Sequence, residues 1–553
     1  MAGVFLRGTT FFAQRTFRLM ELNDRQREAA EAVLQDLERR RAVELVAPQG
    51  FGKTHMSIAL AERLLSQGKI SLAVYVAPTV DLAREVYDRY RGRVSAVMAL
   101  LLGKRNFQCP AFNVEADKAQ CWEEPSGFRL VAYKCFGGPT FVSSAGGRRA
   151  AASYTAVSRS GEVKRVYLYS STCPYSRQYF TLPQAGIIVT TAPKFIIDHA
   201  LGLLPKVDLV VYDEAHDAIE TYLFEREIYV SYRTLRKLAK AASAVGNAPK
   251  VVQEFVEDME EGEADVFKAV DAAAALGMLE MFDELAELYA WRRLMAKYVV
   301  EERGGGVTVR FKPDPSALIP SGAGVLLLSV PPALGRLSAL RRLGVKTVEV
   351  PEAVPHVLKV VLTKSSVPVS VMRRSMKPIY ETEHLRLLLI AEVRRAIVAL
   401  WSASSLDGYY LPYFKGRVDA KTVKKWQGID VLECRDTVIS RAPYPHKEAY
   451  PDPDVYKYVA LRYTMNALRG ARSPSPCAVH LFAFDKHIVS LIAELERYFS
   501  RVEYHRLKTM LVEYDCGGGV KTVDLASADR QTLESLLRCR PLREVSTELE
   551  PFS

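Results

Sequence analysis

Two short segments of this 553-residue chain contain residue types that can hold a nucleoside triphosphate and its metal ion. The first is APQGFGKT (residues 47–54), which follows the apolar run VELV and precedes an amphipathic stretch. Small residues let backbone N–H groups surround phosphate oxygens, and the following helix N-terminus adds partial positive charge. We expect Lys53 to reach the β and γ phosphates and Thr54 to hold Mg²⁺. The loop residues expected to surround the phosphates are Gln49, Gly50, Phe51 and Gly52.

The second segment is DEAH (residues 213–216), which ends the apolar run LVVY about 160 residues after the loop. Asp213 is expected to bind Mg²⁺ through water, and Glu214 to orient and deprotonate an attacking water molecule. His216 is expected to relay between the nucleotide and a nucleic acid. On its own this tetrapeptide is a weak signal, but after a phosphate loop and an apolar strand it is a strong one.

Two further segments of the first hundred residues contain candidate binding residues. Gln26 lies in the amphipathic stretch ELNDRQREAAEAVLQDL, where its amide can read the edge of an adenine or simply face solvent. Taken alone, the solvated helix residue is the better interpretation. In AVYVAPTVDLAREVYDRY, Pro78 and Thr79 precede an expected helix whose N-terminus could hold a nucleic-acid phosphate.

The order of APQGFGKT, APT and DEAH resembles the first three motifs of superfamily 2 helicases. This resemblance implies an α/β fold with two RecA-like parallel-sheet motor domains and ATP between them. WQGID resembles the fifth motif of the family, with Gly428 and Asp430 matching and Gln427 in the place of an acid.

The segment MNALRGAR (residues 465–472) resembles the sixth motif, in which Arg469 and Arg472 match. Their spacing places both on one face of a helix, from which an arginine can stabilise transition-state charge. A basic surface helix is the alternative. Met465 and Leu468 replace the usual glutamine and glycine, and only Ser329 of GVLLLSVPPALG matches the third motif. In the family that motif couples hydrolysis to strand movement.

Four of the eight cysteines lie between the phosphate loop and DEAH, separated by eleven, thirteen and thirty-seven residues. A structural zinc site usually has a tight C-x₂₋₄-C pair, and the ferredoxin spacings are also missing. Spacing alone therefore leaves buried thiols, chance or metal ligands open. The four residues are Cys109, Cys121, Cys135 and Cys173.

The surroundings of these cysteines resemble the iron–sulfur domain of the XPD/DinG branch of superfamily 2, in particular its archaeal XPD-type members. LLGKRNFQCP is similar to the start of that domain and STCPYSRQYF to its end. The resemblance implies a 4Fe–4S cluster on all four thiolates, although Cys121 and Cys135 depart from the family spacing. The glycine-rich and basic segment 137–166 is expected to be a long loop. Cys434, Cys477, Cys516 and Cys539 are expected to be ordinary thiols, with a disulfide such as Cys516–Cys539 as the alternative in a thermophile.

Residues 222–302 are alanine-rich with a helical period, and this insertion resembles the helical arch domain of XPD-like helicases. After about residue 501, a hairpin around Gly517–Gly519 and then a helix are expected, either as a partner-binding module or as an extra edge of the second motor domain. The expected segments are motor domain 1 (1–103, 174–221 and 306–340), the iron–sulfur domain (104–173), the arch (222–305) and motor domain 2 with the tail (341–553).

The net charge of +11 favours a polyanionic partner, and the scarcity of asparagine indicates a thermophile. No apolar run is long enough for a membrane helix or a secretory signal, so a cytoplasmic protein is expected. With the resemblance, these features predict a 5′-to-3′ ATP-dependent DNA helicase that uses ATP, Mg²⁺ and a 4Fe–4S cluster. Its expected partners are single-stranded and forked DNA, bound as a monomer or within a larger complex. The alternatives are a nucleic-acid-binding scaffold with a weakened motor and a translocase that does not unwind.

Overall fold

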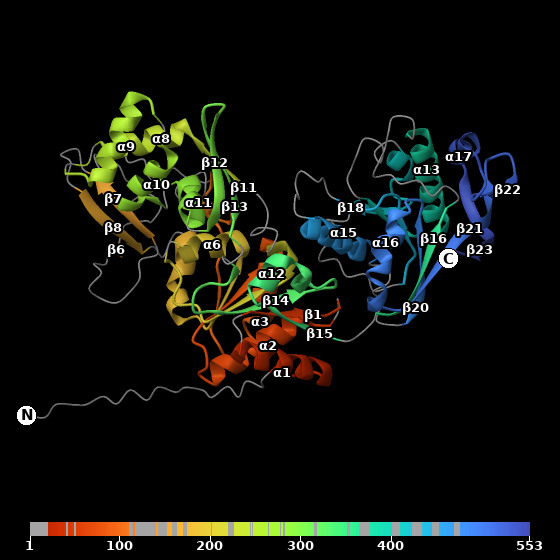
Figure 1. Cartoon of the computed structure of the whole chain (residues 1–553), viewed down its shortest axis with the longest axis horizontal. Helices are drawn as coiled ribbons and strands as arrows, with labels where there is room; N and C mark the ends of the chain where they lie inside the picture. The colour runs from red at the N-terminus through yellow and green to blue at the C-terminus, as the bar shows by residue number, and fades with distance from the viewer. Residues whose placement is uncertain are drawn as a thin grey trace, which may run out of the picture. The chain divides into compact units, whose positions relative to one another are not determined.

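A computed structural model describes most of the chain (Figure 1). Cα packing divides it into two compact units. One takes in Thr54–Asp213 and Arg226–Val325, the other takes in Glu214–Glu225 and Leu326–Ser553, and the segment before Thr54 is shared. The described residues are 20–39, 42–48, 51–109, 114–116, 140–141, 152–157, 163–169, 174–200, 202–218, 226–243, 245, 247–263, 265–276, 278–279, 282–292, 294–314, 318–350, 354–363, 377–400, 410–422, 434–444, 453–468 and 476–552.

A seven-stranded sheet contains both of the segments that were expected to bind nucleotide. Its strand order is β15-β1-β14-β10-β2-β9-β3, and the β1–β15, β10–β2, β2–β9 and β3–β9 pairs are parallel. The strands β1, β2 and β10 are buried along their whole length, as expected for a parallel sheet covered on both faces. The strands are β1 (Ala42–Val46), β2 (Ala73–Ala77), β3 (Met98–Leu100), β9 (Ile187–Thr191), β10 (Leu209–Tyr212), β14 (Gly324–Ser329) and β15 (Lys346–Glu349).

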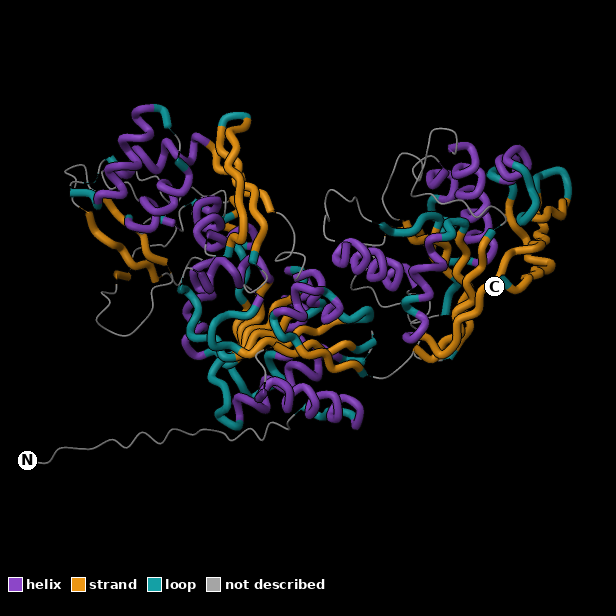
Figure 2. Tube along the Cα trace, in the orientation of Figure 1, coloured by secondary structure: helices purple, strands orange, loops and turns teal. Residues whose placement is uncertain are grey.

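Helices flank this sheet (Figure 2) and begin where its strands end. The helix that follows β2 is capped by Thr79, whose hydroxyl accepts a hydrogen bond of 3.2 Å from the backbone N–H of Leu82. This cap satisfies a donor that the first helical turn would otherwise leave free. The helices are α1 (Asp24–Arg39), α2 (Lys53–Ser66), α3 (Val80–Tyr90), α6 (Ala192–Ala200) and α12 (Ser338–Arg342).

The insertion after DEAH contains four helices and a three-stranded antiparallel sheet of order β11-β13-β12. The helices are α8 (Tyr232–Ala242), α9 (Lys250–Glu261), α10 (Val266–Ala275) and α11 (Asp283–Arg292). The strands are β11 (Arg226–Ser231), β12 (Met295–Arg303) and β13 (Gly306–Pro313). The wholly helical prediction for residues 222–302 was therefore wrong at both ends. At these ends, the apolar runs IYV and YVV lie in the strands β11 and β12. Both strands pair with β13, which lies beyond the alanine-rich segment.

The segment that contains the first group of cysteines also forms strands. β4 (Gln108–Cys109) pairs with β5 (Val114–Glu115), and β6 (Thr140–Phe141) and β7 (Ala152–Val157) both pair with β8 (Val163–Tyr169). The prediction of a long loop over 137–166 was thus wrong for the described part of that segment, because β7 pairs antiparallel with β8.

An eight-stranded sheet of order β18-β17-β19-β20-β16-β21-β22, with β23 also paired to β21, forms the C-terminal part. Its first six strands in that order pair in parallel, which confirms the α/β class with a second parallel sheet. The strands are β16 (Val354–Leu362), β17 (Ile397–Leu400), β18 (Asp419–Thr422), β19 (Thr437–Ile439), β20 (Cys477–Ala483), β21 (Phe499–Asp515), β22 (Val520–Asp524) and β23 (Arg540–Pro551).

Helix α13 (Lys377–Arg394) packs into the core of this second sheet together with Phe414, Met510 and Tyr514. Other helices of this part are α15 (Pro453–Ala467), α16 (His487–Ala493) and α17 (Arg530–Leu536). The expected hairpin at Gly517–Gly519 and the helix after it are confirmed, as β21–β22 and α17. The tail is thus an extra edge of the second sheet.

The four C-terminal cysteines are paired rather than free, so the prediction of ordinary thiols was wrong. Cys516 is bonded to Cys539, and Cys434 to Cys477. Strand register explains both pairs, because β23 returns antiparallel along β21 with Asp515 opposite Arg540, and β19 lies beside β20. No helix within the described ranges is long and apolar enough to cross a membrane.

A buried carboxylate joins three strands of the first sheet. Glu44, on β1, is 0% exposed and accepts hydrogen bonds from the hydroxyl of Ser329 (2.6 Å) and from the backbone N–H groups of Leu334 (2.6 Å) and Gly335 (2.8 Å). Thr347 of β15 adds a fourth donor at 3.1 Å. Burial raises the pKa of the Glu44 carboxyl, and these four hydrogen bonds offset part of that rise. Ser329, the residue that matches the third motif of the resembled family, is therefore tied to the strand that precedes the phosphate loop.

We predict that Glu44→Gln lowers the free energy of unfolding by about 1–3 kcal/mol, because an amide NH₂ must face donors that need an acceptor. Glu62→Gln is the matched control, since buried Glu62 accepts only one described hydrogen bond, from Ser95 N–H at 2.6 Å, which a glutamine carbonyl can keep. Denaturant unfolding of both variants measures the difference.

The same experiment has a pH dependence. Because the folded-state pKa of Glu44 is raised, its contribution is fully present below its unfolded pKa and is lost as the pH rises through the folded value. The advantage of the wild type over Glu44→Gln should therefore shrink with rising pH across that window. Equal stability of the two glutamine variants at every pH would contradict this description of the Glu44 cluster.

Candidate active site

The phosphate loop leads from β1 into α2, which begins at Lys53. Gly52 has a φ of 83°, a left-handed backbone conformation that favours glycine at this position. The side-chain amine of Lys53 is buried and donates to the carbonyl oxygens of Ala47 (3.0 Å) and Pro48 (3.1 Å). The lysine is thus held over the loop that was expected to bind phosphate. Gln49 and Gly50 lie outside the described residues.

Three oxygen-bearing side chains meet beside the start of α2. The Thr54 hydroxyl donates to Oδ2 of Asp213 at 3.4 Å, and the Tyr75 hydroxyl donates to the same oxygen at 2.5 Å. The Tyr75 and Thr54 hydroxyl oxygens are 3.3 Å apart. Asp213 directly follows β10, and Tyr75 is opposite Val211 on the neighbouring parallel strand β2. Thr54 and Asp213 are 159 positions apart in the chain, and both were expected to hold the same metal ion. The structure brings their side chains together.

Tyr75 was not predicted as a site residue. Burial and the nearby Asp213 carboxylate raise the pKa of its phenol well above the usual value, so it is a neutral hydrogen-bond donor at physiological pH. The sequence signal was a single large polar-tipped residue in the strand AVYVA, whose neighbours are small or β-branched. Its importance follows only from the strand order, because β2 has to lie beside β10 for the phenol to reach Asp213.

This set of oxygen atoms fits a magnesium ion. Mg²⁺ binds carboxylate and hydroxyl oxygens and usually takes one or two protein ligands together with substrate phosphates and water. Thr54 and Asp213 supply such ligands, whereas Tyr75 fixes the orientation of the carboxylate. Among the described residues, no group of three or more histidine, cysteine, aspartate or glutamate side chains is arranged to hold a metal ion by itself.

Glu214 and His216 form the second half of the acidic motif. The backbone of Glu214 has a φ of 43°, an uncommon conformation for a non-glycine residue that is concentrated at functional sites. Nε2 of buried His216 lies 3.3 Å from Oε2 of Glu214 and 3.8 Å from Oδ1 of Asp217. His216 is therefore placed to orient the Glu214 carboxylate, which stays partly exposed and available to a water molecule.

Gln26 has a local structural role at the start of α1. Its side-chain oxygen accepts from the backbone N–H of Asn23 at 3.2 Å, and the Asn23 side chain accepts from the backbone N–H of Gln26 at 2.8 Å. These reciprocal bonds form a capping box, which stabilises the helix N-terminus. The expectation that Gln26 reads adenine stays a prediction.

The candidate residues of the second sheet lie mostly outside the described part of the chain, namely Gly428, Asp430, Arg469 and Arg472. Met465 and Leu468, which replace the polar and small residues of the family motif, are buried with 6% and 2% exposure. Asp485, just after β20, accepts from the backbone N–H groups of Ala442 (2.8 Å) and His487 (3.0 Å), and its burial raises the pKa of the carboxyl.

Of the four cysteines expected to bind a cluster, Cys109 ends β4. The other three, Cys121, Cys135 and Cys173, lie outside the described residues. The cluster therefore stays a prediction from the sequence.

Comparison with protein families finds one partial match. Residues 19–119 match the family described as "Type III restriction enzyme, res subunit", a span that includes the phosphate loop and Pro78–Thr79. No curated protein sequence matches the chain.

Three solved structures that match the chain are distant from it in sequence. One named "XPD_Helicase" has 16% identity over 88% of this chain and 100% of its own, with a TM-score of 0.49. One named "XPD_APO" has 14% identity over 87% of this chain and 100% of its own, with a TM-score of 0.45. A DEAD box protein from the hyperthermophile Methanococcus jannaschii has 11% identity over 88% and 97%, with a TM-score of 0.28.

We predict that Tyr75→Phe raises the Mg²⁺ concentration needed for half-maximal nucleotide hydrolysis by about tenfold, equivalent to about 1.4 kcal/mol for a hydrogen bond to a charged group. The physical reason is that the Asp213 carboxylate loses the donor that fixes its rotation. Since the pKa of Tyr75 is raised well above its usual value, the wild-type Mg²⁺ requirement should be flat between about pH 7 and 9.

Tyr212→Phe is the matched control, because it removes a buried tyrosine hydroxyl that donates to the Leu318 carbonyl at 3.3 Å. A Mg²⁺ titration of both variants separates loss of the Asp213 contact from loss of a buried hydroxyl. An unchanged Mg²⁺ requirement in Tyr75→Phe would rule out this positioning role.

Proposed function

We propose that this chain is an ATP-dependent DNA helicase of the XPD type that moves 5′ to 3′ along single-stranded DNA and unwinds forked duplexes. The observation that carries the proposal is the cluster of Thr54, Tyr75 and Asp213 beside Lys53, at the ends of adjacent strands of a parallel sheet. The partial family match over residues 19–119 and the order of sequence motifs support it. The polarity and the preference for DNA come from the family resemblance.

The proposed chemistry assigns one task to each residue of the first sheet. Lys53 would exchange its two loop carbonyls for oxygens of the β and γ phosphates, and Thr54 and Asp213 would hold Mg²⁺. When bound, the ion neutralises negative charge on the phosphates. Glu214 would accept a proton from water as the water oxygen attacks the γ phosphorus, which breaks the bond to ADP. His216 would keep the Glu214 carboxylate oriented.

The second sheet would supply the charge that closes the site. Arg469 and Arg472 are proposed to approach the γ phosphate, with Gly428 and Asp430 in the adjacent motif. The proposed domain limits are those of the sequence, with motor domain 2 beginning near residue 341. In the structure β15, at Lys346–Glu349, pairs with β1 of the first sheet. A 4Fe–4S cluster on Cys109, Cys121, Cys135 and Cys173 is proposed on the resemblance of the surrounding motifs.

A second candidate function is a nucleic-acid-binding scaffold with a weakened motor. The burial of Met465 and Leu468 favours it, since these positions no longer offer a polar or open contact to nucleotide. A translocase that does not unwind is the third candidate, because the third motif keeps only Ser329.

We predict that Lys53→Ala lowers DNA-stimulated ATP hydrolysis by about 100-fold or more, since removing one preorganised charged donor has effects of that order. Lys206→Ala is the control, as Lys206 is 85% exposed and pairs only weakly with Asp208 at 3.8 Å. Unchanged hydrolysis in Lys53→Ala would refute the motor and leave the scaffold. Hydrolysis without unwinding of forks that have either a 5′ or a 3′ tail would favour the translocase.

We also predict that protein purified without oxygen is brown and contains about four irons per chain, as a 4Fe–4S cluster requires. Cys173→Ser should abolish unwinding but keep much of the ATP hydrolysis, because the proposed cluster domain is separate from the phosphate loop. Metal analysis and both activity assays on the same preparation provide the test. A colourless protein with one zinc would contradict the cluster. Loss of ATP hydrolysis in Cys173→Ser to the level of Lys53→Ala would contradict its separate role.

A further inference from the structure

Helix α8 of the insertion places four cationic side chains on one side. Their spacing of three, four and seven positions is that of one helix face, and they extend over about 10 Å at 1.5 Å per residue. The opposite face packs inward, with Leu235, Leu238 and Ala242 buried. We call the four cations the α8 basic face, and they are Arg233, Arg236, Lys237 and Lys240.

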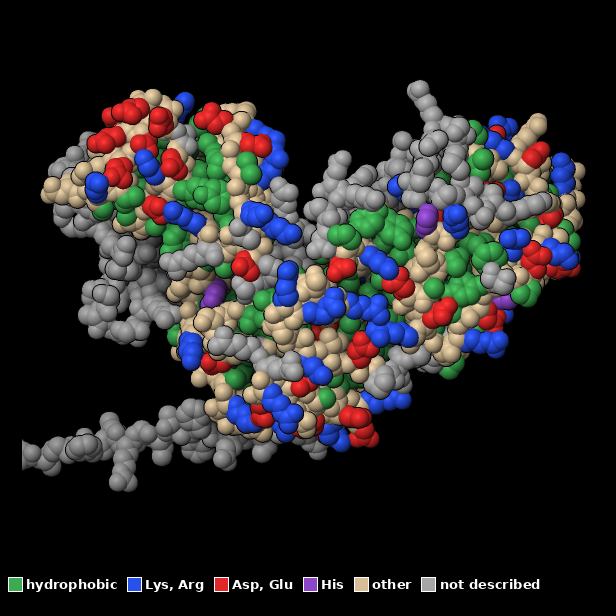
Figure 3. Space-filling model, viewed as in Figure 1, with side chains coloured by type: hydrophobic (Ala, Val, Ile, Leu, Met, Phe, Trp, Pro, Cys, Tyr) green, Lys and Arg blue, Asp and Glu red, His purple; other side chains and the backbone are tan. Residues whose placement is uncertain are grey.

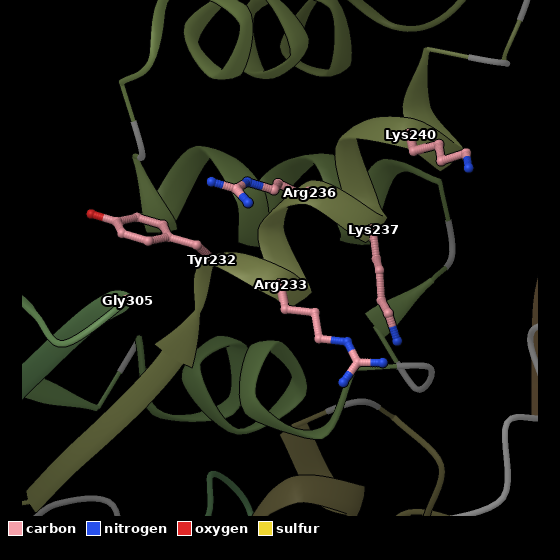
Figure 4. A pocket seen from close by; sticks show the side chains of 6 residues that line it. All are labelled: Tyr232, Arg233, Arg236, Lys237, Lys240 and Gly305. Carbon is pink, nitrogen blue, oxygen red and sulfur yellow. The ribbon is translucent and has the colours of Figure 1, made fainter.

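The α8 basic face lines an open hollow of about 480 Å³ together with Tyr232 and Gly305 (Figure 4). Gly305 is at the tip of the β12–β13 hairpin, and its carbonyl accepts from the backbone N–H of Tyr232 at 2.9 Å. Its φ of 91° favours glycine, and open space lies where a Cβ would project. In Figure 4, Arg233 and Lys237 extend to one side, whereas Arg236 extends back toward the Tyr232 ring. The hollow thus combines cations with an aromatic ring.

The charges of the insertion are otherwise largely balanced by its own acids. Each of six other cations in it has an acidic partner within ion-pair distance. These pairs are Arg226–Glu287, Lys250–Glu254, Lys268–Asp258, Arg292–Asp271, Arg303–Glu301 and Arg310–Glu301. Arg233 and Arg236 have no such ion pair within the described residues, and both are exposed. Burial raises the pKa of the Tyr232 phenol, and the nearby Glu302 carboxylate, which forms a hydrogen bond with its hydroxyl, raises it further.

Positive and negative charge are therefore separated across the insertion. The helix α9 carries the acidic sequence EDMEE, and Figure 3 shows acidic side chains gathered over that part of the molecule. An acidic partner would be repelled there and attracted to α8. The unpaired guanidinium groups of Arg233 and Arg236 are fork-shaped donors that suit phosphate oxygens.

We propose that the α8 basic face is a binding site for the backbone of a single-stranded nucleic acid, with Tyr232 as a stacking surface for one base. Cations spread over about 10 Å exceed what one small anion needs and match a repeating phosphate chain. A basic groove beside an aromatic ring is the combination by which proteins bind single strands without reading sequence. The inference rests on the proposed function, since it adds a holding site for the same polymer outside the ATP-binding sheet.

The test is the salt dependence of binding of a fluorescent thymidine oligonucleotide to the full chain without nucleotide. Arg233→Gln/Arg236→Gln should weaken binding and make the slope of log K against log [KCl] shallower by about 1.4, at about 0.7 per lost phosphate contact. Lys206→Gln/Lys250→Gln is the matched control, because it removes the same charge from side chains that are 85% and 89% exposed. Equal affinities and slopes of the two double variants would overturn the proposal.

The aromatic part of the site has its own pair of variants. Tyr232→Phe keeps a ring and should bind within about twofold of the wild type, whereas Tyr232→Ala should lose about fivefold or more, the lower range for one stacked base. Equal binding by both variants would remove Tyr232 from the site.

The outcome is separable from that of the proposed function. Lys53→Ala should keep the wild-type affinity and salt slope, because Lys53 is not part of the α8 basic face. Unchanged ATP hydrolysis in Lys53→Ala together with a shallower slope in Arg233→Gln/Arg236→Gln would refute the motor and keep the α8 site. DNA-stimulated hydrolysis that is lost in Lys53→Ala, together with identical slopes in the two double variants, would keep the motor and refute the α8 site.

Discussion

The parallel pairing of β10 with β2 is the constraint on which the candidate site depends. The register places Val211 opposite Tyr75. Asp213, the residue directly after β10, therefore accepts a hydrogen bond from the Tyr75 hydroxyl. Helix α2 starts at the end of β1 and brings Thr54 to the same oxygen. A change of register by one residue would turn Tyr75 to the other face of the sheet and remove a donor from Asp213.

Glu44 extends this arrangement to the neighbouring strands. Its two carboxylate oxygens take four donors from β14, the segment after it and β15, so the start of the phosphate loop is fixed relative to the third motif. The space is tight, because a Cβ at Gly335 would lie 2.3 Å from the Thr347 hydroxyl. Ser329 is the residue of that motif which contacts Glu44, which gives a physical reason for its presence beside two prolines that the family pattern lacks.

The sequence predicted the parts of the fold that local pattern determines. The phosphate loop, the acidic motif and the C-terminal hairpin follow from apolar runs bounded by glycine and by polar residues. Tyr75, the two disulfides and the strand β11 could not be predicted in this way, because each depends on a partner distant in the chain. The strand β12 pairs with β13, which follows it after two glycines, so its signal was local and was missed. Cys516 reaches Cys539 only through the return of β23 along β21, and Tyr75 reaches Asp213 only through the strand order.

The groups that contact each cationic side chain distinguish structural from ligand-facing positions in this chain. Burial alone would lower the pKa of Lys194, but Asp198 at 2.7 Å and the tyrosine hydroxyls around it raise the pKa and keep the amine charged. Lys53 is held by backbone carbonyls, which cannot neutralise it and are easily exchanged for phosphate. Arg233 and Arg236 are exposed and have no acidic partner among the residues that the structure describes, so a polyanion that binds them displaces no ion pair seen there. The buried Lys194 is thus fixed by an acid of its own helix, whereas the exposed guanidinium groups of Arg233 and Arg236 are placed to act on external phosphates.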